Sequence, residues 1–238
     1  MKRLIALTLA LAGLVATVRA GDAYAVATSS NGGSASATAT ATGNSSSVAI
    51  AGASHGGRAV ANSSAIGDRN GYASSRAVAT ADRGTALSDS WADARGSLGG
   101  SAIADSESIA AAIGGRAISS SAAFADGVRF GRARSRSTST ALSHFGVAVS
   151  DSQATSRGIF GGDASSVSDS TAETFGGESR TRSYVLSDAR YHAVATADGF
   201  GISTSGWNGY RSARVHAVSR ATHHGHSRVI AAEIELEP

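Results

Sequence analysis

Residues 132–141 read Arg-Ala-Arg-Ser-Arg-Ser-Thr-Ser-Thr-Ala. Its small side chains take every second position, while arginine and threonine fill the positions between them. A period of two places the small residues on one face of an extended strand, whereas a helix would scatter them around its axis. The same alternation recurs at residues 102–110, 117–125, 148–156, 164–172 and 193–197. The sequence therefore predicts an all-β protein.

A short repeat connects these stretches. A Gly-x-Ala/Ser step returns about every 13 to 16 residues, at Gly43, Gly57, Gly71, Gly84, Gly100, Gly115, Gly131, Gly146, Gly162 and Gly177. Four Phe-Gly steps follow one another at a spacing of 15, beginning at Phe130, Phe145, Phe160 and Phe175. Such a period is typical of a small unit that has been copied and stacked, because one unit alone cannot bury a core. We expect a repeat array over residues 43–221, with the four phenylalanines stacked as a structural ladder.

Two folds fit this repeat. In a β-solenoid or β-roll, each coil has about 15 residues, with two short strands and two turns. In an antiparallel β-meander, each repeat is one long strand and a turn, which explains the unbroken alternation in residues 133–143. The solenoid explains better why one face holds only alanine, serine and threonine, because a narrow coil has little space inside. We favour the solenoid and keep the meander as the alternative.

A known pattern appears at Ser47-Val48-Ala49-Ile50 and in residues 59–68, which read Ala-Val-Ala-Asn-Ser-Ser-Ala-Ile-Gly-Asp. These residues resemble the repeats in the head domains of YadA-like trimeric autotransporter adhesins. The resemblance implies a left-handed parallel β-roll in an extracellular setting, and a role in binding host or matrix surfaces. It is best over residues 43–85. Neither a heptad stalk nor a terminal set of membrane strands accompanies the repeats, so trimer formation and membrane anchoring are not implied.

Both ends of the chain differ from the repeats. Residues 1–25 resemble an export signal, with a basic start, a short apolar run, and small residues that allow cleavage after Ala20 or Ala25. Residues 26–42 form a lead-in rich in alanine, serine and threonine. Residues 222–238 form a link that contains histidines and then a strand with alternating apolar and glutamate residues. We expect that strand to cap the array with its acidic face, or to dock its apolar face on another subunit.

Composition limits the classes of function. The chain has no cysteine, so no disulfide supports the fold outside the cell. The formal net charge is +3 and falls to about +1 if cleavage after Ala25 removes Lys2, Arg3, Arg19 and Asp22. A near-neutral charge spread over the chain gives no reason to expect nucleic acid as a partner. The mature chain has no segment apolar enough for a transmembrane helix.

Catalytic motifs are missing from the sequence. It contains no nucleophile elbow, metal-protease helix or phosphate loop. Serines are frequent because the repeat needs small residues. We therefore expect a protein that is not an enzyme and uses no cofactor.

Two groups of residues are candidate sites. Arg132, Arg134 and Arg136 share one strand face and are candidates for binding an anionic ligand such as a surface glycan. Nearby aspartates favour an ordinary solvated face. The histidines His223, His224 and His226 are candidate metal ligands. Because no carboxylate or thiolate lies beside them, we expect a solvated link rather than a metal site.

The sequence supports two functional hypotheses. In the first, the chain is a secreted, non-enzymatic structural or adhesive repeat protein, outside the cell or on the cell surface, in a bacterium. Its partners would be surface glycans, matrix proteins or other host and cell-surface components. In the second, it is a self-associating subunit of an extracellular fibre, similar to a biofilm amyloid, because low net charge and stacked small residues favour growth at strand edges.

Overall fold

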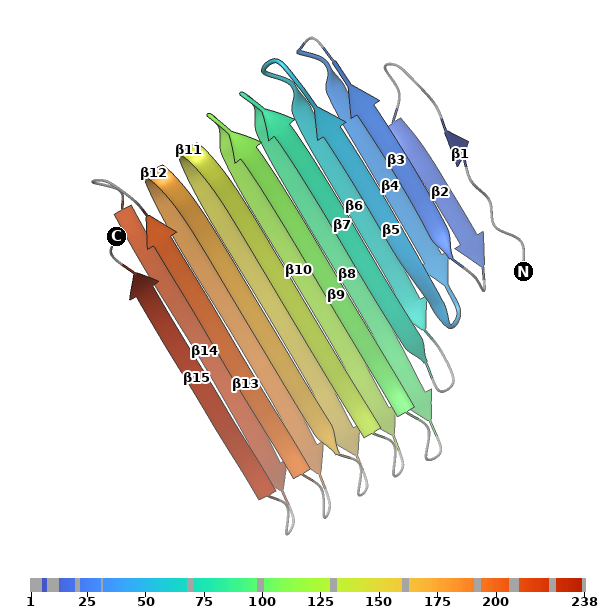
Figure 1. Cartoon of the computed structure of the whole chain (residues 1–238). Helices are drawn as coiled ribbons and strands as arrows, with labels where there is room; N and C mark the ends of the chain where they lie inside the picture. The colour runs from blue at the N-terminus through green and yellow to red at the C-terminus, as the bar shows by residue number, and fades with distance from the viewer. Residues whose placement is uncertain are drawn as a thin grey trace.

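The fold is known from a computed structural model, in which every described element is a β-strand. The structure describes residues 6–7, 13–19, 22–30, 32–67, 71–97, 101–128, 132–159, 163–190, 194–205, 210–222 and 226–236. Figure 1 shows the strands stacked side by side, from β1 and β2 at one end to β14 and β15 at the other. The prediction of an all-β repeat fold is confirmed.

The strands form two sheets. The first sheet contains β1 (Ala6–Leu7), β3 (Ala23–Ser29), β5 (Ser45–Ala53), β7 (Tyr72–Asp82), β9 (Ser101–Ile113), β13 (Val194–Ser205) and β15 (His226–Leu236). The second contains β2 (Gly13–Arg19), β4 (Ser34–Thr42), β6 (Arg58–Gly67), β8 (Thr85–Ser97), β10 (Arg116–Val128) and β14 (Tyr210–Thr222). The long strands β11 (Arg132–Ile159) and β12 (Ala164–Arg190) run through a corner and contribute to both sheets.

Each strand pairs in parallel with the strand before and after it in its own sheet. The chain therefore coils, crossing from one sheet to the other at every corner, and forms a parallel β-solenoid. This pairing excludes the antiparallel meander. Partners in adjacent coils, such as Ser135 and Ser166, are 31 residues apart. The predicted coil length of about 15 residues is thereby corrected: the repeat in the sequence is one strand plus one corner, and two repeats complete a coil.

The coil widens along the chain. Asp22 and Ser46, at the same place in successive coils, are 24 residues apart, whereas the later pair Ser156 and Ser187 is separated by 31. The strands of the first sheet lengthen over the same coils, from 7 residues in β3 to 9 in β5, 11 in β7 and 13 in β9. The two ends of the solenoid therefore differ in cross-section, and Figure 1 shows the shorter strands near β1.

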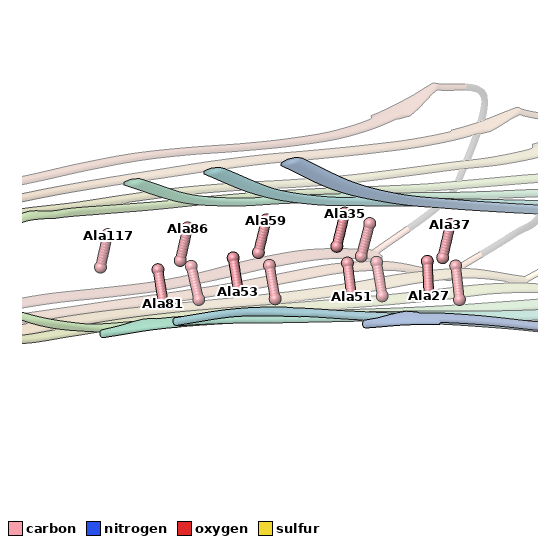
Figure 2. Close-up of a cluster of buried hydrophobic side chains, with 14 of the residues drawn as sticks. Ala27, Ala35, Ala37, Ala51, Ala53, Ala59, Ala81, Ala86 and Ala117 are labelled. Atoms are coloured by element: carbon pink, nitrogen blue, oxygen red, sulfur yellow. The ribbon is translucent and has the colours of Figure 1, made fainter. Parts of the chain in front are cut away.

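The core is a single thin layer of small side chains. In Figure 2, Ala35, Ala59 and Ala86 of the second sheet point toward Ala51 and Ala81 of the first. Inward positions hold mainly alanine and serine, and the largest fully buried side chain among the described residues is Val185. The predicted face is confirmed: Ala133, Ser135, Ser137, Ser139 and Ala141 are buried, while the arginines between them are exposed.

Glycines occupy one corner because the coils touch there. A Cβ at Gly115 would overlap the carbonyl oxygen of Gly84, and a Cβ at Gly146 would overlap that of Gly115. The same contact recurs along this corner at Gly57, Gly84, Gly115, Gly146 and Gly177. Any side chain there would push adjacent coils apart. This contact explains why every second step of the repeat, from Gly57 to Gly177, has glycine at this corner.

The solenoid extends beyond the predicted array at its N-terminal end. β3 and β4, which cover most of the lead-in, pair with β5 and β6 in the same parallel manner. β1 and β2 lie within the predicted export signal. A cut after Ala20 would leave β3 whole, whereas a cut after Ala25 would remove the buried residues Ala23 and Ala25. If residues 1–25 act as an export signal, cleavage after Ala20 is therefore the site that keeps β3 in the solenoid.

Candidate functional site on the outer faces

Serine hydroxyl groups of the core bond to one another and to backbone carbonyl groups. Ser121 Oγ donates to the carbonyl oxygen of Ser106 at 2.8 Å, and Ser137 Oγ donates to that of Ser121 at 2.8 Å. Repeated steps of this kind zigzag between the sheets through Ser47, Ser63, Ser75, Ser90, Ser106, Ser121, Ser137, Ser152, Ser168 and Ser183. These serines have structural partners and are shielded from solvent, so ligands must meet the outer faces of the sheets.

Arg132, Arg134 and Arg136 lie exposed on the outer face of the first sheet, as their parity predicts. Arg132 Nε is 3.9 Å from Asp163 Oδ2, and Arg136 lies in register with Asp105 of β9. The arrangement brings the three arginines together and places acids beside two of them. Their binding of an anionic ligand stays a prediction.

The predicted histidine cluster is only partly described. His226 begins β15 and is exposed, while His223 and His224 lie outside the described residues. Within the part of the chain that the structure describes, no three histidine or acidic side chains come together to hold a metal ion.

Aromatic rings gather at the corner that follows the first half of β11. Phe145 and Phe175 meet edge to face with ring centroids 5.7 Å apart, and His144 stacks on Phe175 at 5.3 Å. Phe130 and Phe160 of the predicted ladder lie outside the described residues. A groove of about 650 Å³ runs beside the pair; its lining combines alanine, Ile113 and Leu142 with polar and acidic residues, among them Thr80, Asp82, Ser143 and Glu173. Contact between Phe145 and Phe175 follows from the coil length, because they are close to one full coil apart.

A second hollow of about 550 Å³, which we call the arginine–tyrosine trough, lies on the outer face of the second sheet. It runs across β10, β11, β12 and β14. One side is the column Ser120, Asp151, Arg182 and Arg214, and the other is Ala122, Gln153, Tyr184 and His216. The Tyr184 and His216 rings stack with centroids 5.3 Å apart and planes 6° apart. The sequence prediction missed this site, because Arg182 and Arg214 come into register only when a coil has about 31 residues.

Charges on both outer faces are mostly balanced between adjacent strands. One column of the second sheet alternates strictly in charge, through Arg95, Asp126, Arg157, Asp188 and Arg220. On the first sheet, Arg76 Nε lies 3.2 Å from Glu107 Oε2. Opposite charges thus lie on adjacent strands at several places, which limits repulsion between coils there.

Four aspartates on the outer faces have altered acidity. Burial raises the pKa of Asp89, Asp105, Asp151 and Asp169 above the ordinary value. Nearby cations partly oppose the rise in pKa, with Arg182 acting on Asp151 and with Arg134 and Arg136 acting on Asp105. These carboxyl groups therefore take up protons more readily than free aspartate does.

The C-terminal strand has its acidic side toward the interior of the solenoid. Glu233 lies in register with the inward residue Gly201, while Ile234 lies in register with the outward residue Ile202. The backbone N–H of Val215 in β14 donates to Glu233 Oε1 at 2.6 Å. Glu233 therefore satisfies a backbone group at the open edge of β14, and a further coil would have to cover its charge.

No family model, curated protein or solved structure matches this chain. Within the described residues, no helix is long and apolar enough to cross a bilayer. Only the solenoid and its outer faces therefore indicate what the chain does.

Proposed function

We propose that the chain is an exported, non-enzymatic structural or adhesive protein that binds surface or matrix components through the outer faces of its solenoid. The observation that carries this proposal is the division of chemistry between core and surface. Serine hydroxyls of the core bond to each other and to carbonyls, while arginines and most exposed aromatic rings lie outside. On the outer faces the register places side chains of successive coils next to one another, as with Tyr184 and His216. Side chains aligned across several coils suit a polymer or a surface better than a small substrate.

The two ends of the solenoid favour discrete particles. β3 has 7 residues and β4 has 9, whereas β15 has 11 and β14 has 13. A second copy stacked head to tail would leave much of the wider end uncovered. The inward charge of Glu233 opposes the same contact, since inward charges on an edge strand hinder pairing.

The resemblance to heads of YadA-like adhesins adds to this proposal. The Ser-Val-Ala-Ile motif of β5 places Val48 and Ile50 outside, and the two inward residues are small. A bacterial cell-surface or extracellular location belongs to the same proposal.

A fibre subunit is the second candidate, and one observation favours it. Among the described strands, β14 pairs only with β12, and β15 pairs only with β13, so both present an edge for further pairing. If the chain is a fibre subunit, the open edges of β14 and β15 must pair with strands of another copy, although the two ends of the solenoid differ in width.

Binding of the secreted chain to immobilised matrix proteins and polysaccharides tests the first candidate. We expect saturable binding that is lost when the chain is unfolded by heat. The triple variant R132Q/R134Q/R136Q shows whether the first-sheet arginines take part. If the folded chain binds no surface in a broad panel, the adhesive role is wrong.

A further inference from the structure

Arg182 and Arg214 form an unusual pair among the charges of this solenoid. They lie directly opposite each other on β12 and β14, and both are exposed. No other register pair of the described strands places two cations together. Neither arginine forms an ion pair within 4.0 Å with another described residue. Like charges directly opposite in a sheet are destabilising, and Asp151 lies in register with Arg182 but not with Arg214, so an anion from outside would stabilise the pair further.

The opposite side of the arginine–tyrosine trough is suited to a sugar ring. Tyr184 and His216 stack into one aromatic wall, and the exposed fraction of Tyr184 is 38%. On each strand the arginine and the aromatic ring are two residues apart: Arg182 and Tyr184 on β12, and Arg214 and His216 on β14. This spacing is about 7 Å, so one sugar ring can contact both sides of the trough. Crossing four strands, the trough is roughly 15 Å long, which suits a linear polymer.

Hydrogen-bond acceptors complete the trough. Asp151 lies in register with Arg182, and its Oδ1 is buried without a hydrogen-bond partner. Gln153 is exposed beside Tyr184, and Glu233 reaches the trough near Val215. Carboxylates accept hydrogen bonds from hydroxyl groups and repel any anionic group that lies directly against them. A ligand with acid groups spaced apart and many hydroxyl groups between them therefore fits the trough.

We propose that the arginine–tyrosine trough binds an anionic polysaccharide, a sugar polymer that bears carboxylate or sulfate groups. Arg182 and Arg214 bind the acid group, Asp151 and Gln153 bind sugar hydroxyls, and Tyr184 packs on a sugar ring. A bidentate contact between guanidinium and carboxylate gives the strongest of these bonds. This inference rests on the proposed surface-binding function and names the ligand class for one face.

Calorimetric titration of the full secreted chain with an oligogalacturonate tests the inference. A neutral cello-oligosaccharide of equal length is the matched ligand. We expect the acidic oligomer to bind about tenfold or more tightly than the neutral one, and R182Q/R214Q to lose about tenfold or more of that affinity. The control R58Q/R116Q removes two exposed arginines from the same sheet, outside the trough, and keeps the affinity. Equal binding of both sugars, or full affinity in R182Q/R214Q, would overturn the inference.

Thermal unfolding provides a second test, whose first part uses no sugar. Since Arg214 faces a like charge, we expect R214Q to unfold at the same or a higher temperature than the unchanged chain without ligand. The oligogalacturonate should raise the midpoint of the unchanged chain and not that of R214Q. A lower midpoint for R214Q without ligand would contradict the role of the pair as an unfilled anion site.

Two further outcomes separate the inference from the proposed function. Single-stranded oligonucleotide binding as tight as that of the acidic sugar would overturn the inference in favour of nucleic acid. If the chain binds matrix or cell surfaces but no acidic sugar, the ligand class is wrong and the surface-binding function stands. Failure to bind any surface overturns both.

Discussion

A Cβ atom at Gly199 would lie only 2.7 Å from Cγ1 of Val215 across the core. Gly199 belongs to β13 of the first sheet and Val215 to β14 of the second. The same atom would be 3.1 Å from Cγ2 of Val185. The last coils thus keep the sheets close by opposing valine with glycine, where earlier coils oppose small residues with small residues.

This relationship predicts a destabilised Gly199→Ala variant. Added volume in a packed core costs about 1–3 kcal/mol of unfolding free energy. The double variant G199A/V215A should regain most of that loss, because the second change removes the nearest clashing methyl. Urea unfolding of both variants measures the effect. The control Gly52→Ala meets its nearest atom at an ordinary 3.5 Å on the outer face, so its stability should barely change. Additive losses in the double variant would contradict the proposed contact.

Adjacent glycines at one corner offer a second test. Gly114 has φ of +67° with nothing within 4 Å of an added Cβ, so alanine there costs about 1–2 kcal/mol of backbone strain. Gly115→Ala should cost more, roughly 3 kcal/mol or above, because its Cβ would overlap the carbonyl oxygen of Gly84. Thermal unfolding of the two variants compares them directly. A milder effect at Gly115 than at Gly114 would disprove close contact between the coils.

The serine chain of the core predicts a contrast between two adjacent serines. Ser75 is buried; its Oγ donates to the carbonyl oxygen of Ser63 at 2.8 Å and accepts a bond from Ser90 Oγ at 2.9 Å. Ser75→Ala should lose about 1–3 kcal/mol of unfolding free energy, because Ser90 and Trp91 N–H also lose a partner. Ser74→Ala, on the outer face, should stay within about 0.5 kcal/mol. Equal effects would show that the buried bonds contribute little.

Stability should rise as the pH is lowered from 7 toward 4. Burial raises the pKa of Asp89, Asp105, Asp151 and Asp169, so the folded chain binds more protons than the unfolded chain in this range. Where the folded state binds more protons, the free energy of unfolding falls as pH rises. The gain is complete below the ordinary aspartate pKa and is lost as pH rises through the folded values. Thermal midpoints across this range measure the slope, and D151N should reduce it. A midpoint that falls steadily on acidification would contradict the raised pKa values.

Alternation in the sequence was sufficient to predict strands, the small-residue face and stacking. In residues 132–141 the parity assigns every inward and outward side chain correctly. Coil length was wrong by a factor of two, since the two strands of a coil have nearly the same composition and the repeat cannot distinguish a half coil from a full one. The error hid the trough: Arg182 and Arg214 are far apart in the sequence, and only the register brings them together.

Electron microscopy of the purified chain without residues 1–20, fresh and after several days, shows whether the chain forms a discrete solenoid with unequal ends. We expect short particles, on the order of 40 Å along the stacking direction, whose length does not change with time. Deletion of residues 227–238 removes most of β15 with Glu233 and should promote association. Fibrils of the unchanged chain that lengthen over days would contradict the account and support the fibre subunit.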